Sequence, residues 1–143
     1  AVLPLAGTTG QVLSKVDGAD YNTEWTTLPT PDLSAIYTTT FITDATTART
    51  LIATDSGKTI RFTSGSATVV TVDASTDFTV GTRVDIIADG AGELTVAAST
   101  ATVAAAEVAT TSGSFTVGAQ YSSATLLCVA TDEYRLIGNV AAV

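Results

Sequence analysis

The sequence contains no histidine and a single cysteine, Cys128, among its 143 residues. A serine or cysteine hydrolase triad needs a base with a pKa near neutrality, usually His, so this chemistry is excluded. The common zinc geometries require several Cys or His ligands, which one cysteine cannot supply. No disulfide can form within the chain. Cys128 lies in the apolar run ATLLCVA, which indicates a small core residue rather than a nucleophile.

Basic residues are also scarce. Six Lys and Arg stand against 14 Asp and Glu, giving a net charge of −8. The six cations are spread singly, whereas nucleic-acid binding requires clustered Lys or Arg that release counterions. The same lack disfavours an anionic membrane surface, and no apolar run reaches the roughly 18 residues of a membrane span. The composition therefore predicts no nucleic-acid partner and no membrane insertion, and the acidity contributes to solubility.

Aromatic residues make up 6% of the chain and charged residues 14%, while Thr is the commonest type. A sequence rich in Thr, Val and Ala favours strands, because β-branched side chains suit a pleated surface and lose rotamer freedom in a helix. The chain has no Met and begins with Ala, which fits a gene product whose initiator was removed, or an excised fragment.

The chain length fits one compact domain with a short appendage. Residues 1–40 form an N-terminal arm that holds all three prolines. In this arm QVLSK and TEWTTL flank the turn-forming segment DGAD, which predicts a small hairpin. TPDLSAIY (residues 30–37) predicts one helical turn. An isolated hairpin is marginal in water, so its apolar side chains need a further surface, either the rest of the chain or other copies of the arm.

Residues 41–143 form the second domain. Short β-like runs recur every 8 to 12 residues or so with turn signals between them, a spacing typical of sandwiches and barrels. The expected class is all-β: a β-sandwich or jelly-roll-like domain with an extended arm. IIADGAGELTV (86–96) predicts a hairpin about a glycine-bearing turn, RTLIAT (49–54) a strand, and ATVAAAEVAT (101–110) a strand plus loop. No repeat of 20 to 50 residues is apparent.

Carboxylates and tyrosines are the remaining candidates for chemistry or binding. Asp73 and Asp77, and Asp85 and Asp89, are too sparse for a calcium loop. A glycosidase pair cannot be recognised from sequence, because it is defined by carboxylate separation. The alternative is that these residues end strands and cap turns. Tyr121 and Tyr134 are candidate glycan contacts that could stack on sugar rings; half-buried packing on strands is the alternative.

The segment GTTGQVLSKVDGADYNTEW (7–25) resembles a motif of tailed-bacteriophage fibre and head-fibre proteins. The resemblance rests on the run from Gly7 to Leu13 and on Asp20, Tyr21, Glu24 and Trp25. The later β-rich region is similar to domains of phage tail fibres and virion appendages. Such proteins are typically trimers attached to the capsid or tail, so the resemblance implies a homotrimer on the virion surface. The chain is shorter than a usual tail fibre and has no repetitive shaft, which disfavours a long-fibre role.

Two features of the arm agree with a trimer. Glycines at positions 7 and 10 would let three chains approach closely near an axis. The expected interface or attachment residues are Gly7, Gly10, Val12, Leu13, Tyr21 and Trp25. A fully buried Leu or Val contributes about 1.5–3 kcal/mol, so three copies of this cluster could hold a trimer.

These observations give three hypotheses. The first is a non-enzymatic virion structural protein, a short trimeric capsid decoration or head-fibre protein, with no cofactor or metal. Its partners are copies of itself and the major capsid protein or another virion protein. The second is a tail fibre or spike tip that binds host surface polysaccharide. The third is a polysaccharide depolymerase using the four Asp residues named above.

Overall fold

The computed structural model describes residues 7–9, 11–18, 23–27, 40–105 and 108–143. The chain divides into two compact units, Ala1–Tyr37 and Thr38–Val143. The sequence places this boundary after residue 40, and the first strand of the second unit begins at Thr40.

The N-terminal unit contains the expected hairpin. β1 (Gln11–Lys15) pairs antiparallel with β2 (Thr23–Thr27), and Leu13 lies opposite Trp25. The hydroxyls of Ser14 and Thr26 lie 2.6 Å apart and form a cross-strand hydrogen bond. The helical turn expected in TPDLSAIY lies outside the described residues.

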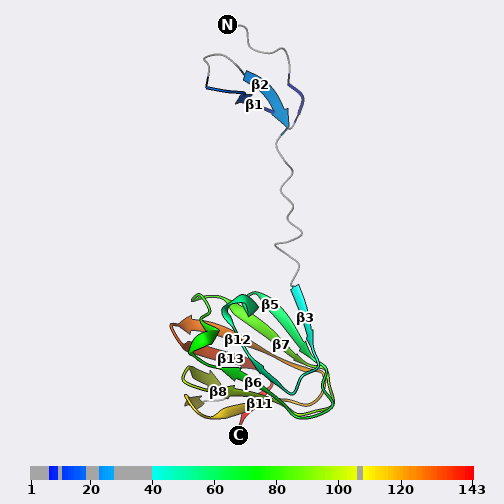
Figure 1. Ribbon diagram of the computed structural model, residues 1–143, viewed down its shortest axis with the longest axis vertical. Coiled ribbons are helices and arrows are strands. Elements are labelled where there is room, and N and C mark those ends of the chain that lie inside the picture. The colour runs from blue at the N-terminus through cyan, green and yellow to red at the C-terminus, as the bar shows by residue number, and fades with distance from the viewer. Residues whose placement is uncertain (1–6, 10, 19–22, 28–39, 106–107) are drawn as a thin grey trace. The chain divides into compact units, whose positions relative to one another are not determined.

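The second unit is a sandwich of two β-sheets, which confirms the predicted all-β class (Figure 1). The seven-stranded sheet has the order β10 (Val108–Thr110), β9 (Thr102–Ala105), β13 (Glu133–Gly138), β12 (Ser122–Ala130), β7 (Arg83–Ala88), β5 (Lys58–Phe62), β3 (Thr40–Asp44). The five-stranded sheet has the order β14 (Val140–Ala142), β11 (Ser114–Val117), β8 (Leu94–Ala98), β6 (Thr68–Val72), β4 (Ala48–Thr50). Two short 3₁₀ turns, η1 (Ala53–Asp55) and η2 (Ala74–Thr76), connect strands.

From β3 to β8 the chain alternates between the two sheets. As a result β3, β5 and β7 are parallel neighbours in one sheet, and β4, β6 and β8 are parallel neighbours in the other. Parallel neighbours need a long crossover, and here a strand of the opposite sheet supplies it. Jelly rolls are built from antiparallel Greek keys, so of the two predicted arrangements the sandwich is the one observed.

These stacked windings are a structural repeat that the sequence does not reveal. Thr40 pairs with Lys58, an offset of 18, whereas Thr59 pairs with Asp85, an offset of 26. Because the offset changes between windings, no fixed period is present in the sequence.

The hairpin predicted for IIADGAGELTV is wrong. β7 belongs to the seven-stranded sheet and β8 to the five-stranded sheet, so the glycine-bearing loop crosses between layers. This loop stacks on the preceding one: Gly90 N–H donates to Phe62 O at 2.9 Å and Gly92 N–H to Ser64 O at 3.2 Å. A Cβ on Gly90 would lie 2.7 Å from the Ser64 carbonyl carbon. The glycines therefore permit close stacking of loops, not a two-residue turn.

The strand predicted for RTLIAT is largely wrong. Only Arg49 and Thr50 of this run belong to β4, after which Leu51 is fully buried and η1 begins. The Asp55 carboxylate accepts the Ile52 N–H at 3.2 Å, and the Asp55 N–H donates to Ile52 O at 2.8 Å. These local bonds favour a tight turn over an extended strand. The strand expected within 101–110 is present as β9, but residues 108–110, where a loop is expected, form a second strand, β10, that pairs antiparallel with β9. Residues 106–107 lie outside the described part.

The core lies between the sheets and follows the alternation of the strands. β8 and β11 show strict alternation of buried and half-buried residues, as expected when one face of a strand contacts the core. The phenyl ring of Phe78 meets the Tyr134 ring edge-on, with centroids 5.9 Å apart. Cys128 is buried and its thiol donates to Phe78 O at 3.2 Å, which confirms the predicted core role.

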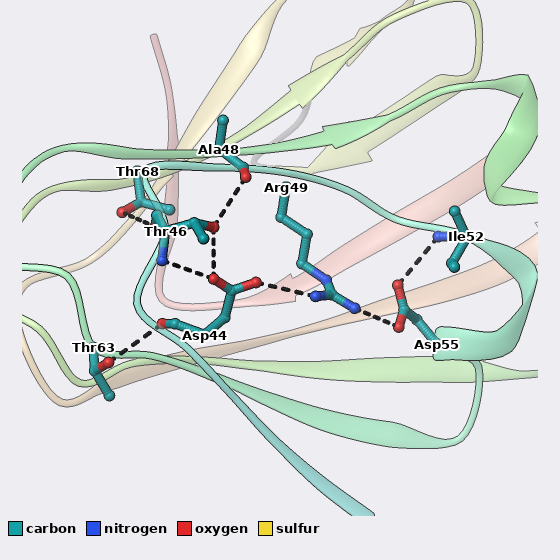
Figure 2. A network of polar contacts seen from close by, with 8 residues as sticks. All are labelled: Asp44, Thr46, Ala48, Arg49, Ile52, Asp55, Thr63 and Thr68. Carbon is teal, nitrogen blue, oxygen red and sulfur yellow. Dashed lines mark hydrogen bonds and ion pairs between the residues drawn. The ribbon is translucent and has the colours of Figure 1, made fainter.

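An ion network ties together the edge strands at one end of the sandwich (Figure 2). Arg49 on β4 contacts Asp44 at the end of β3 at 3.0 Å and Asp55 of η1 at 2.6 Å. Asp44 also accepts the Thr46 N–H at 2.8 Å and the Thr46 hydroxyl at 2.6 Å. Both carboxylates are buried, so the guanidinium joins β3, β4 and the following turn through charge-assisted bonds.

The electrostatics of Asp44 follow from these contacts. Burial acts to raise the pKa of Asp44, but the hydrogen bonds from Thr46 and Arg49 outweigh it, so this pKa lies below its ordinary value. For Arg49, burial acts to lower the pKa, and the hydrogen bonds to Asp55 and Asp44 reverse the effect. Asp44 and Arg49 therefore stay ionised at neutral pH.

Candidate functional site

The arm brings Gly7 and Trp25 together within one chain. A Cβ on Gly7 would lie 2.5 Å from both Cδ2 and Cε3 of the Trp25 indole. The sequence suggests that Gly7 gives room for neighbouring chains, whereas the close approach observed is to the chain's own tryptophan. Thr8 is tied to the start of β1, since its N–H donates to the Gln11 side chain at 2.9 Å.

Apolar side chains of the same arm remain accessible. Val12 is 39% exposed, Leu13 38% and Val16 52%, while Trp25 is half-buried. Two strands of five residues each cannot cover these groups on both faces. Of the expected interface set, Gly10 and Tyr21 lie outside the described residues.

Tyr134 is not a surface residue, and its assignment as a glycan contact is wrong. Its side chain is fully buried, and its hydroxyl accepts the Phe78 N–H at 3.4 Å. Burial raises the pKa of this phenol. The alternation of β13, with Tyr134 and Leu136 buried, directs the ring into the core.

Tyr121, the other candidate, is 76% exposed. It immediately precedes β12 and has a φ of 71°, in the left-handed region that side chains other than glycine rarely adopt. Its N–H donates to Ala88 O at 2.6 Å, which anchors the backbone to the end of β7. An aromatic side chain is thus held in solvent at a strained position where glycine would be favoured.

The residues next to this anchor point in the chain, Gln120 and Asp89, make polar contacts of their own. The Gln120 amide donates to Asp89 O at 2.9 Å. Oδ2 of the Asp89 carboxylate accepts from Arg61 Nε at 2.7 Å and also contacts Arg61 Nη2, so one carboxylate oxygen receives both guanidinium nitrogens. The Asp89 backbone is itself fixed, because its N–H donates to Phe62 O at 2.9 Å. Together Tyr121, Gln120, Asp89 and Arg61 form what we call the Tyr121 corner.

The sequence alone does not identify Arg61 and Gln120 as members of this corner. The alternation of TIRFT does place Arg61 on the outer face, but its pairing with Asp89 depends on a parallel contact between β5 and β7. Gln120 lies in the turn before β12, and its contact with the Asp89 carbonyl depends on the position of the loop after β7. The sequence also gives no indication that Arg49 joins two buried carboxylates, because RTLIAT has the pattern of an ordinary strand.

The two outer faces of the sandwich differ in chemistry. Outward positions of the seven-stranded sheet include charged and large apolar side chains: Phe41, Arg61, Arg83, Asp85, Ile87, Leu127, Arg135 and Ile137. Outward positions of the five-stranded sheet carry only Ala, Ser, Thr and Val in the described strands: Ala48, Thr50, Val69, Thr71, Thr95, Ala97, Ser114, Thr116 and Ala141. In the described strands, the outward charged side chains therefore lie on the seven-stranded face, which includes Arg61 of the Tyr121 corner.

The four aspartates of the depolymerase hypothesis have separate roles. Asp73 caps η2 by accepting the Ser75 N–H at 2.8 Å, and Asp77 adopts the left-handed conformation at the end of that turn. Asp85 accepts the Thr125 hydroxyl at 2.6 Å, and Asp89 pairs with Arg61 as described. Within the described residues, no group of three or more His, Cys, Asp or Glu side chains is placed to hold a metal ion.

The sequence matches no protein-family model and aligns significantly with no curated protein. In the part of the chain that the structure describes, no helix is long and apolar enough to cross a bilayer.

Proposed function

We propose that this chain is a non-enzymatic structural protein of a bacteriophage virion, a short trimeric decoration or head-fibre protein. The N-terminal hairpin mediates trimer formation or attachment to the major capsid protein or another virion protein. The sandwich is the projecting domain. The resemblance of residues 7–25 to phage fibre and head-fibre motifs supplies the virion setting.

The observation that carries the proposal is the composition of the arm. Val12, Leu13 and Val16 are exposed on a two-stranded unit, and none of its described residues is among the buried hydrophobic side chains. Burying a Val or Leu side chain contributes about 1.5–3 kcal/mol, so contact with other chains would stabilise the hairpin strongly. Cyclic symmetry offers each copy the same surface and closes the assembly.

The first test is the solution mass of the purified chain, measured by light scattering after size exclusion. We expect three times the 14.4 kDa of one chain. Leu13→Asp should dissociate the trimer, because it places a charge in the apolar contact. Val69→Asp is the matched control: Val69 is 40% exposed, like Leu13, but lies on the sandwich. Wild-type protein that remains monomeric would contradict the trimer.

The second test concerns the particle. Antibody labelling of purified virions should locate the protein on the capsid surface, and its deletion should leave genome packaging intact. If the protein is missing from purified particles, the virion proposal fails regardless of its oligomeric state.

A second candidate function is the tip of a tail fibre or spike that binds host surface polysaccharide. The exposed side chain of Tyr121 favours it, because the Tyr121 backbone is bonded to Ala88, next to Asp89 of the fixed Arg–Asp pair. Labelling that places the protein on the tail instead of the capsid would select this candidate.

A further inference from the structure

We infer that the Tyr121 corner is a binding site for a neutral glycan. This inference deepens the second candidate function. It requires neither a trimer nor a virion, because the whole corner lies within the second unit of one chain.

The backbone at Tyr121 is the first argument. A bulky residue in the left-handed region is a rare outlier, and strain of this kind concentrates at binding sites and ligand clamps. Burial does not explain the tyrosine, since its side chain is 76% exposed and takes no part in the core. A ring held in solvent at a conformational cost is what a stacking platform requires, because a sugar presents its C–H faces to an aromatic surface.

The rigidity of the surrounding groups is the second argument. Arg61, Asp89 and Gln120 are each held in place by a hydrogen bond of 2.7 to 2.9 Å. Asp89 and Gly90 both donate backbone N–H groups to Phe62 O, so the loop below is fixed to β5. Planar carboxylate, guanidinium and amide groups are suited to pairs of neighbouring sugar hydroxyls, and prior fixation lowers the entropy cost of binding.

Charge decides which glycan fits. The Arg61 charge is matched by Asp89, which leaves the pair neutral. The chain as a whole carries a net charge of −8, which repels a polyanion. The corner is therefore suited to neutral hexoses, deoxyhexoses or N-acetylhexosamines, and an acidic polysaccharide is disfavoured.

The test uses the full chain and a glycan array, followed by saturation-transfer NMR with methyl glycosides of glucose, galactose, mannose, fucose and N-acetylglucosamine. We expect binding to at least one neutral sugar, with transfer to its ring protons. Tyr121→Gly should weaken binding about tenfold or more through loss of the aromatic contact. The same change should raise the thermal midpoint, because glycine adopts a positive φ without strain.

Two further variants keep the result interpretable. Tyr121→Phe should retain most of the binding, since the ring remains. Ile137→Thr is the matched control, because Ile137 is also exposed on the seven-stranded face, on β13. The inference is overturned if no neutral glycan binds, if only acidic glycans bind, or if Tyr121→Gly binds as well as the wild type. Failure of these tests would leave the trimer and virion proposal unaffected.

Discussion

Gly90 lies directly against the backbone of Ser64, with no room for a side chain between the two loops. The Gly90 N–H donates to Phe62 O, so the loop after β7 continues the parallel stacking of the strands beyond their ends. This contact explains why the segment that joins β7 of one sheet to β8 of the other carries a glycine at position 90.

We expect Gly90→Ala to lower the free energy of unfolding by about 2 kcal/mol or more, since overpacking against backbone forces the loops apart. Gly65→Ala is the control, because a Cβ there would meet no atom within 4 Å. Urea unfolding of both variants measures the difference. Equal stabilities would show that the stacked loops are not closely packed in solution.

Arg49 should be among the most sensitive positions of the sandwich. Arg49→Ala leaves Asp44 and Asp55 buried without their shared cation, which is expected to cost about 3–5 kcal/mol. Replacing all three residues together, with Arg49→Met, Asp44→Asn and Asp55→Asn, should recover much of the loss, because no unpaired charge remains. Denaturant midpoints would reveal the pattern, and a triple variant no better than Arg49→Ala would refute it.

We expect acid to lower the free energy of unfolding of the sandwich, in part because Asp44 becomes protonated. Its pKa is below the ordinary 3.8 in the folded chain, so ionised Asp44 stabilises the fold above that pH. This stabilisation is lost as the pH falls through the lower folded value. Asp44→Asn should be less stable than the wild type at neutral pH, and the gap should narrow below about pH 4. A gap that stays constant from pH 7 to 2 would contradict this assignment.

The single thiol should report on unfolding. Cys128 is 1% exposed, and burial, followed by the nearby negative charge of Asp132, raises its pKa. Because the thiolate is the reactive form, the native protein should react with a disulfide reagent far more slowly than a denatured sample. The labelling rate should rise in Gly90→Ala, by about tenfold for each ~1.4 kcal/mol of lost stability. Rapid labelling of the native wild type would show that the core opens easily.

Gly7→Ala should disturb the arm without disturbing the sandwich. A methyl group at this position meets the Trp25 ring at 2.5 Å, so the indole must move. Trp25 is the only tryptophan, so its fluorescence emission should shift while the unfolding midpoint of the sandwich stays unchanged. Gly18→Ala is the control, since no atom lies within 4 Å of a Cβ there. An unchanged spectrum would mean that Trp25 does not rest on Gly7.

The candidate site was only partly accessible from the sequence. Tyr121 and Tyr134 both follow or begin a strand-like run, and nothing local distinguishes them. The structure separates them because β13 turns Tyr134 toward Phe78, whereas Tyr121 precedes its strand in a left-handed turn. Arg61 and Asp89 are 28 positions apart, and only the parallel registration of β5 with β7 brings them together.

The sequence by itself determined the all-β class, the hairpin of the arm, the core position of Cys128 and most strand segments. These follow from local preferences, because β-branched residues, alternation and turn residues act over a few positions. Only the tertiary structure decided that successive strands alternate between sheets and pair in parallel. That choice depends on contacts between segments about 20 residues apart in the sequence, such as the parallel pairing of Arg49 on β4 with Val70 on β6. It also depends on loops that can stack only where a glycine leaves space for the neighbouring backbone.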